Sequence, residues 1–416
     1  MNKISITNII NIIKNSLSYI DERVIQHGER VAYIIYMMKK AENNLSAQEI
    51  YDYCILAMLH DIGAYKTEEM DNILKLDTFD DDKHTIYGYL YIKYFTSVKE
   101  KADAILYHHS SFEEIMNSDC INKDIARSIA FADRMDVFLT YHNSDDLSEF
   151  ERILGDYVSH EDYSLFINAN KDNIIIHNLK DGKNTEIIEA FFEDVNKNNS
   201  TYILWLFSLI FMIDFRSPIT LAHTMTTAII SEEIAKRMAL SEEEIQKVML
   251  GAFLHDFGKI NTPIEILQKE GSLNPKEMDI MKEHVKFTKE ILSGNVNEEI
   301  MNIATRHHEK LDGSGYPYGL KGSELTQLEK IVAVADIASA LFTERSYKRA
   351  YSVEKITSIL SDMSNKGLIC NNATSILINN KEQIFLRASN IEKEMKDYYN
   401  EMINEYTVIK SKRKIV

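Results

Sequence analysis

Ten of the 13 histidines in this chain fall into two sets of five that recur in the same order. The first set comprises His27, His60, His84, His108 and His109, and the second comprises His223, His255, His284, His307 and His308. In each set an aspartate directly follows the second histidine (Asp61, Asp256), and an Ala-Asp pair closes the series (Asp133, Asp336). Imidazole and carboxylate groups are the ligands of divalent transition metals. The sequence therefore predicts a duplicated metal-binding domain.

The repeat extends to the residues that precede each His-Asp pair. Ser46 and Ser241 each lie fourteen residues before the pair, and each is followed three residues later by a glutamate. This is the capping-box pattern of a helix start. Apolar residues at helical spacing then lead into LHDIG and LHDFG. We predict that the pair lies near the C-terminal end of a helix that the following glycine terminates.

The composition favours helices throughout. The chain has only four prolines and 14 glycines in 416 residues, which is enough length for two domains with hydrophobic cores. We predict an all-α protein with two tandem helical-bundle domains. The first covers residues 1–155 and the second 200–400, with a connecting segment at 156–199 that includes a strand-like piece, Asn173–His177, and a basic tail at 401–416.

Charge and cysteine usage restrict the partners and the compartment. A formal net charge of −17 disfavours binding to nucleic acid or to an anionic membrane. A phosphorylated substrate would therefore need a local cluster of basic residues. Three scattered cysteines argue against a disulfide framework and favour a reducing cytoplasm.

One apolar run, residues 202–213, is twelve residues long. A membrane-spanning helix needs roughly 20 residues. We interpret this run as a buried helix at a domain interface or in a homodimer.

The predicted ligands of the second domain are spread over five expected helices. These carry, in order, His223, the pair His255-Asp256, His284, the pair His307-His308, and Asp336. Ligands that converge from several helices form a rigid site in a bundle core. An adjacent His-Asp pair suits a carboxylate that bridges two metals. Two metals roughly 3.5–4 Å apart can hold a bridging hydroxide and position a phosphodiester for in-line attack.

The order H…HD…H…HH…D resembles the HD superfamily of metal-dependent phosphohydrolases. The second domain adds HDFGK (255–259), HHEKLDGSGYPYGL (307–320) and RSYK (345–348). With these motifs it is similar to the HD-GYP family, whose members hydrolyse cyclic dinucleotides, chiefly cyclic di-GMP. The similarity covers roughly residues 214–360.

The resemblance implies roles for particular residues. It implies that the metal ligands are His223, His255, Asp256, His284, His307, His308 and Asp336. It also implies that Asp256 bridges the metals, that Lys259, Arg345 and Lys348 contact the phosphates, and that the loop with Tyr316 shapes the substrate cleft. The family implies iron or manganese, and the same ligands also permit zinc, nickel or cobalt.

The second domain departs from the family pattern at several positions. Family members with a third metal have carboxylates at the positions of Ile219 and Ser339, so we predict two metals. No arginine follows His223 within Thr224–Thr227, and Val285 replaces the usual proline. These last two changes concern the substrate more than the metals.

The first domain keeps every counterpart ligand but lacks the residues for the substrate. Ala64 replaces the lysine, residues 110–119 replace the Gly-Tyr-Pro loop, and His142 and Asp145 replace the two cations. We interpret it as a degenerate HD domain that still binds metal, with a regulatory or architectural role. This second metal site would comprise His27, His60, Asp61, His84, His108, His109 and Asp133. A second catalytic centre with another substrate is the alternative.

The sequence thus predicts a cytoplasmic phosphodiesterase of bacterial second-messenger signalling. It would open cyclic di-GMP to the linear dinucleotide, with further hydrolysis to GMP as an open question. One alternative is a phosphodiesterase for cyclic GMP-AMP, and another is a signalling module that binds a cyclic dinucleotide without turnover.

Overall fold

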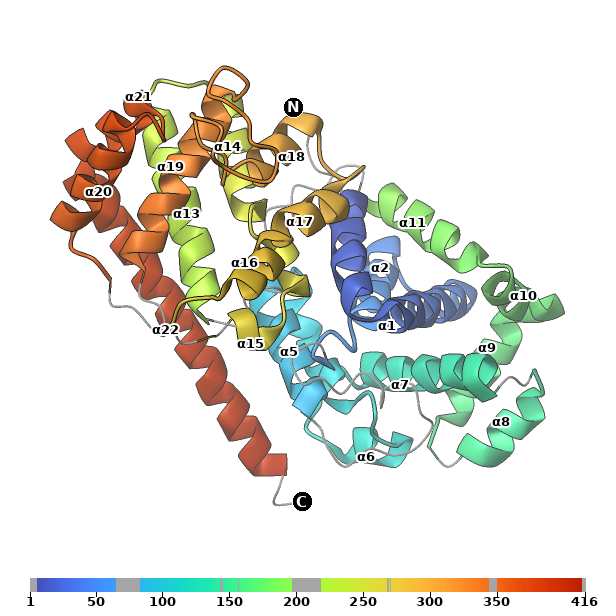
Figure 1. The fold of residues 1–416 in the computed structure, drawn as a ribbon. Helices are drawn as coiled ribbons and strands as arrows, with labels where there is room; N and C mark the ends of the chain where they lie inside the picture. Colours follow the sequence, from blue (N-terminus) through green and yellow to red (C-terminus); the bar gives the residue numbers. More distant parts are fainter. Residues whose placement is uncertain are drawn as a thin grey trace. The chain divides into compact units, whose positions relative to one another are not determined.

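The computed structural model describes residues 6–64, 83–142, 145–155, 157–196, 218–267, 269, 271–343 and 350–413. In these ranges the regular elements are helices, and the extended pairing is a single bridge between Asp312 and Lys321 (Figure 1). The prediction of an all-α fold is confirmed. Among the helices that the structure describes, none combines the length and apolar character needed to cross a membrane.

The described residues divide into two compact units. The N-terminal unit holds residues 17–196 with 6–10 and 402–413, and the C-terminal unit holds 218–401 with 11–16. The predicted apolar helix at 202–213 lies outside the described residues.

The N-terminal unit is a bundle of helices. Its helices are α1 (Ile6–Glu42), α2 (Ala47–Met58), α5 (Lys83–Phe95), the 3₁₀ helix η1 (Lys99–Tyr107), α6 (Phe112–Asn117), α7 (Lys123–Val137), the π-helical turn η2 (Phe138–His142), α8 (Leu147–Leu154), α9 (His160–Ala169), the short η3 (Lys171–Asn173), α10 (Ile174–Lys180) and α11 (Lys183–Asn196). The last turns of the chain's final helix, α22 (Lys381–Arg413), also belong to it.

The strand predicted at Asn173–His177 is wrong, because α10 occupies this segment. Three consecutive isoleucines favour a strand by propensity, but local capping and burial decide otherwise. The side-chain oxygen of Asn170 accepts hydrogen bonds from the backbone N–H groups of Ile175 and Ile176. Both isoleucines are buried, which fixes the segment as a helix.

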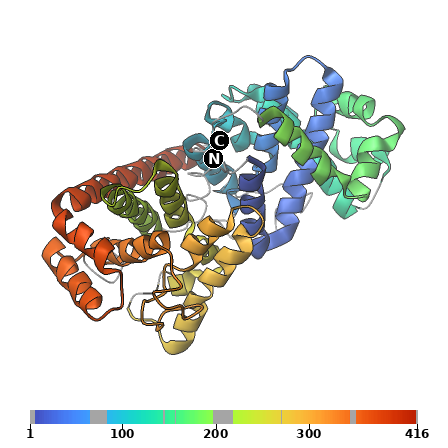
Figure 2. The same ribbon diagram turned by 90° about the horizontal axis from the view of Figure 1, so that it is seen from above.

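The C-terminal unit packs its longest helices around one apolar core. Its helices are α13 (Pro218–Arg237), α14 (Glu242–Leu254), the 3₁₀ helix η4 (Phe257–Asn261), α15 (Ile264–Leu267), α16 (Pro275–Lys282), α17 (His284–Leu292), α18 (Glu298–Thr305), α19 (Gln327–Phe342), α20 (Val353–Asn365), α21 (Asn371–Asn379) and the first part of α22. Helix α13 lies beside both α14 and α19 (Figures 1 and 2). Isoleucine, valine and alanine side chains dominate the core between them.

The predicted helix starts are confirmed. Ser46 and Ser241 are both N-caps with complete capping boxes, in which the serine hydroxyl accepts from the backbone of Glu49 or Glu244. The pairs lie at the C-terminal ends of these helices, as predicted, since α2 ends at Met58 and α14 at Leu254. The predicted termination by the following glycine is wrong, because each helix ends before its His-Asp pair. The two pairs therefore lie in the turn that follows the helix.

The glycine of each His-Asp turn has a packing role instead of a helix-ending role. A Cβ on Gly258 would lie 1.9 Å from the carbonyl oxygen of His284, and one on Gly63 would lie 2.0 Å from that of His84. Only glycine allows so close an approach of two backbone segments. In both units this contact brings the His-Asp turn against the helix that carries the third histidine, α5 or α17.

Candidate metal centre

Three histidines of the C-terminal unit are oriented by their own backbone. In each, Nδ1 lies within hydrogen-bond distance of the carbonyl oxygen three residues earlier. These pairs are His255 with Ala252 at 2.6 Å, His284 with Met281 at 2.6 Å, and His307 with Ala304 at 2.7 Å. A hydrogen bond at Nδ1 fixes the ring and leaves Nε2 as the free donor atom for a metal.

The predicted fourth helix is present as α18, but it does not carry His307 and His308. Helix α18 ends at Thr305, and both histidines lie in the turn that follows. His223 is in the middle of α13, His284 is the first residue of α17, and Asp336 lies on α19, as expected.

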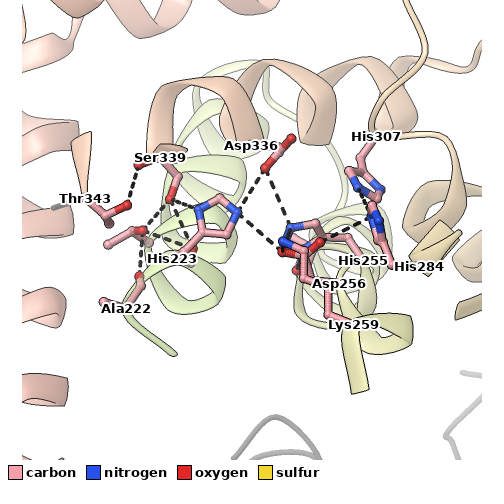
Figure 3. A network of polar contacts seen from close by, with 12 residues as sticks. Ala222, His223, His255, Asp256, Lys259, His284, His307, Asp336, Ser339 and Thr343 are labelled. Carbon is pink, nitrogen blue, oxygen red and sulfur yellow. Dashed lines mark hydrogen bonds and ion pairs between the residues drawn. The ribbon is translucent and has the colours of Figure 1, made fainter. Parts of the chain in front are cut away.

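Two buried carboxylates join the histidines into one cluster. Asp256 faces His255 with Oδ2, at 3.2 Å from Nε2, and faces His284 with Oδ1, at 3.5 Å from Nε2. Asp336 likewise lies 3.1 Å from His223 Nε2 through Oδ1 and 3.6 Å from His308 Nδ1 through Oδ2. Figure 3 shows side chains of α13, α17 and α19 converging with those of the turn after α14 at these two carboxylates.

The donor atoms separate into two groups of three. One group is His223, His255 and Asp256, and the other is His284, His307 and His308, with ligand atoms within 4.8 Å of one another in each group. The second oxygen of Asp256 extends toward the second group. The structure thus brings all seven predicted ligands together in an arrangement that suits two cations bridged by Asp256.

Two donor atoms of the cluster are buried and make no hydrogen bond. His255 Nε2 and Asp256 Oδ1 have no hydrogen bond although both are inaccessible to solvent. Burying an unsatisfied polar atom is unfavourable, so such atoms indicate a ligand. The chemistry of the donors, imidazole nitrogen and carboxylate oxygen, fits a divalent transition metal.

The protonation states also suit metal binding. Burial lowers the pKa of His284 to about 3 and that of His308 to about 4, so both rings are neutral donors at physiological pH. Burial alone would raise the pKa of Asp256, but His255 and Lys259 beside it hold this pKa well below its ordinary value. The carboxylate is therefore ionised and ready to bridge cations.

Lys259 is the described cation nearest the centre among the predicted phosphate-binding residues. Its Nζ pairs with Asp256 Oδ2, and its side chain is 15% exposed. The two other predicted cations, Arg345 and Lys348, lie outside the described residues.

Tyr316 connects the Gly-Tyr-Pro loop to the centre. Its ring lies against that of His308, with centroids 4.6 Å apart. Burial raises the pKa of its hydroxyl, which stays a hydrogen-bond donor. Lys282, at the end of α16, places its Nζ 5.4 Å from the centre of the Tyr316 ring. Sequence reasoning missed this lysine, since it belongs to no motif and meets the loop only in the folded chain.

Glu309 is a second residue that sequence reasoning missed. It is 3% exposed, and its carboxylate accepts from the backbone N–H of Tyr318 at 2.7 Å and of Leu320 at 2.9 Å. The glutamate directly follows the His-His pair and so ties the loop to the ligands. The sequence signal that could have identified Glu309 is its position directly after the paired histidines, in HHEK.

Ser339 and Thr226 support the first histidine of the centre. His223 Nδ1 lies 3.0 Å from Ser339 Oγ, which in turn contacts the hydroxyl of Thr226. Ser339 thus orients a ligand through a neutral hydroxyl.

The N-terminal unit gathers its seven counterparts in the same manner. Its ligand groups are His27, His60 and Asp133, and Asp61, His84, His108 and His109. The substitution of the lysine by Ala64 places a buried methyl group at the corresponding position.

Comparison with known proteins identifies the class of both units. Two matches to family models described as HD domain cover residues 24–137 and residues 208–369. Both helical units are therefore HD domains, a metal-dependent class of domain.

Similar proteins extend this result. A protein of Vibrio cholerae named 3′3′-cGAMP-specific phosphodiesterase 1 is 27% identical over 388 residues, which are 87% of this chain and 88% of the relative. The cyclic di-GMP phosphodiesterase response regulator RpfG of Xanthomonas campestris is 41% identical over 145 residues, 34% of this chain and 38% of the relative. Both units of the chain thus match HD domains, and the chain is similar to cyclic-dinucleotide phosphodiesterases.

A solved structure shows the same fold. A cyclic GMP-AMP-specific phosphodiesterase of V. cholerae (V-cGAP3) aligns with a TM-score of 0.54 at 17% identity and covers 91% of this chain and 98% of its own.

Proposed function

We propose that the C-terminal unit hydrolyses a cyclic dinucleotide and that cyclic di-GMP is its first candidate substrate. The observation that carries the proposal is the convergence of three histidines on the two oxygens of Asp256, with Lys259 at the same carboxylate. A pair of divalent cations, when bound there, supplies an activated water and neutralises charge on the phosphate.

The protein's own residues would orient the substrate. Lys259 lies where it can share its charge between Asp256 and a phosphate oxygen, which favours the charge that develops in the transition state. Tyr316, in the Gly-Tyr-Pro loop, offers a hydroxyl and a ring face beside His308, and Lys282 next to its ring offers a second cation. In a chain of net charge −17, such a local set of cations is what an anionic substrate requires.

Cyclic GMP-AMP is the second candidate, and one observation favours it. The relative named for this substrate matches along 87% of the chain and thus includes the N-terminal unit, whereas RpfG matches 34%. Both substrates present the same two phosphodiester groups, so the centre accommodates either by the same chemistry. We expect the linear dinucleotide as the main product, in the cytoplasm, with iron or manganese at two positions.

The test compares the two His-Asp pairs of the repeat. Purified protein loaded with Fe(II) or Mn(II) is given cyclic di-GMP and cyclic GMP-AMP, and the linear products are separated by chromatography. We expect turnover by the wild type and by the matched control His60→Ala/Asp61→Ala, and none by His255→Ala/Asp256→Ala. Binding of either nucleotide without turnover under both metals would favour the non-catalytic signalling module instead.

A further inference from the structure

The N-terminal unit contains a complete second set of donor atoms with its own bridging geometry. Asp61 lies 3.2 Å from His60 Nε2 through Oδ2 and 3.3 Å from His108 Nε2 through Oδ1. Asp133 lies 3.0 Å from His27 Nε2 through Oδ1 and 3.6 Å from His109 Nδ1 through Oδ2. The same two-carboxylate pattern joins the histidines in the C-terminal unit.

Buried atoms that make no hydrogen bond indicate that this set binds a ligand. His27 Nε2, His60 Nε2, His108 Nε2 and both oxygens of Asp61 are inaccessible to solvent and have no hydrogen bond. These atoms meet one another and Asp133 in histidine–carboxylate contacts of 3.0–3.9 Å, and so many buried polar atoms gathered at one point without hydrogen bonds indicate a ligand. Their types are those of metal ligands.

The two centres differ at the residue that supports the first histidine. His27 Nδ1 lies 2.7 Å from Asp136 Oδ2, and Arg30 holds the same carboxylate with two hydrogen bonds of 2.7 and 2.9 Å. Asp136 is fully buried. At the equivalent positions the C-terminal unit has Ser339 and Thr226, both neutral.

A carboxylate behind a ligating histidine fixes the ring and raises its basicity as a ligand, so it strengthens metal binding. Because both oxygens of Asp136 are already used by His27 and Arg30, this residue supports a ligand and does not hold a third metal.

The N-terminal centre lacks the counterpart of Lys259, and two described arginines near it are engaged within the protein: Arg30 donates to Asp136, and Arg413 donates to Thr85 and to the Leu106 carbonyl. Ala64 stands where Lys259 stands in the other unit. Arg134, next to Asp133, donates to the backbone carbonyls of Ala130 at 2.9 Å and His109 at 2.7 Å, and it also contacts those of His108 and Ser110. Its guanidinium closes the turn that carries the paired histidines, so it does not face a substrate.

We propose that the N-terminal unit is a second two-metal centre, specific for divalent transition metals, that retains its ions more tightly than the catalytic one and does not hydrolyse the cyclic dinucleotide. Its comparison with a catalytic centre rests on the proposed function, whereas metal binding by the N-terminal unit does not, and the test measures metal so that the two can fail separately.

The first arm of the test counts metal. Full-length protein is loaded with Mn(II), dialysed and analysed for metal per chain. We expect about four ions for the wild type and about two for each of His255→Ala/Asp256→Ala and His60→Ala/Asp61→Ala. If His255→Ala/Asp256→Ala holds no Mn(II), the N-terminal centre does not bind metal and the proposal is wrong.

The second arm measures retention. Release of Mn(II) from the wild type to excess EDTA should occur in two phases, and His60→Ala/Asp61→Ala should lack the slow one. In the His255→Ala/Asp256→Ala background, Asp136→Asn should weaken Mn(II) binding by about 10- to 100-fold, while Ser339→Ala leaves it unchanged. Release of all ions from the wild type in one phase would contradict the claim of tighter retention. This measurement uses the wild type and so remains decisive if Asp136→Asn does not fold.

Discussion

At the scale of single residues, the site depends on how each polar group is partnered. Lys259 pairs with Asp256 in the C-terminal unit. The N-terminal repeat keeps the aspartate as Asp61 but has Ala64 at the position of the lysine. The ligands that hold metal and the lysine that faces substrate are thus separable by mutation.

Lys259→Ala should lower kcat by about 100-fold, because it removes a positive charge from the phosphate in the transition state. Metal content should stay as in the wild type, since the seven ligands remain. Kinetics together with metal analysis check this, and Lys269→Ala, which removes a lysine that pairs with Glu277, is the control. Loss of the metal with the activity would assign Lys259 to the integrity of the centre instead.

Asp162 gives a prediction about pH and stability. It is 1% exposed, and burial raises its pKa to about 6 even though Arg127 Nη1 lies 3.4 Å away. The folded state therefore binds the Asp162 proton more tightly than the unfolded state, so the contribution of this group to stability is largest below about pH 4 and is lost as pH rises through about 6. Asp162→Asn should raise the free energy of unfolding at pH 7.5 by about 2 kcal/mol.

The measurement for Asp162 is denaturant unfolding at pH 4 and pH 7.5. Asp124→Asn, which alters an exposed partner of the same Arg127, serves as the control and should change little. A loss of stability at pH 7.5 in Asp162→Asn would show that the ion pair outweighs the burial of the charge.

At the scale of elements, the sequence predicted what local patterns determine. The capping boxes at Ser46 and Ser241 set two helix starts correctly, because the signal lies within four residues. The exact helix ends and the turn that carries His307 depend on long-range packing, which a periodicity pattern does not contain. Lys282 was missed for the same reason, since its contact with Tyr316 spans two elements. The helix α10 was missed because three isoleucines favour a strand by propensity, whereas capping by Asn170 and burial select a helix.

The Gly-Tyr-Pro loop gives the prediction at this scale. Glu309→Gln replaces one of the two carboxylate oxygens that accept from the loop backbone, and an amide cannot satisfy both N–H groups. We expect KM to rise by about 10-fold, as one charge-assisted hydrogen bond is lost, with metal content unchanged. Steady-state kinetics test this, and Glu324→Gln is the control, because Glu324 accepts from the exposed Lys321 N–H. An unchanged KM would show that the loop does not depend on Glu309.

At the scale of the whole molecule, each unit is completed by residues distant in sequence. The last turns of α22 belong to the N-terminal unit, where Glu405 accepts from Lys93 at 2.6 Å and from Tyr89 at 2.7 Å. Arg413 donates to Thr85, the residue after His84. The basic end of the chain thus packs on α5, the helix that carries His84.

Removal of residues 402–416 should loosen this helix. Amides of α5 should exchange with solvent about 10-fold faster or more in the truncated chain, because Glu405 and Arg413 no longer hold it. Hydrogen exchange with mass spectrometry measures this, and a chain that ends after Arg413 keeps these contacts and is the control. Unaltered exchange in α5 would show that the segment does not stabilise the N-terminal unit.

The account depends most on two cations at the seven ligands of the C-terminal unit. Anomalous diffraction from crystals soaked in Mn(II) measures this directly. We predict two peaks about 3.5–4 Å apart, one on either side of the Asp256 carboxylate. A C-terminal unit with no peak among His223, His284 and Asp336, in crystals that bind Mn(II) elsewhere, would contradict the account.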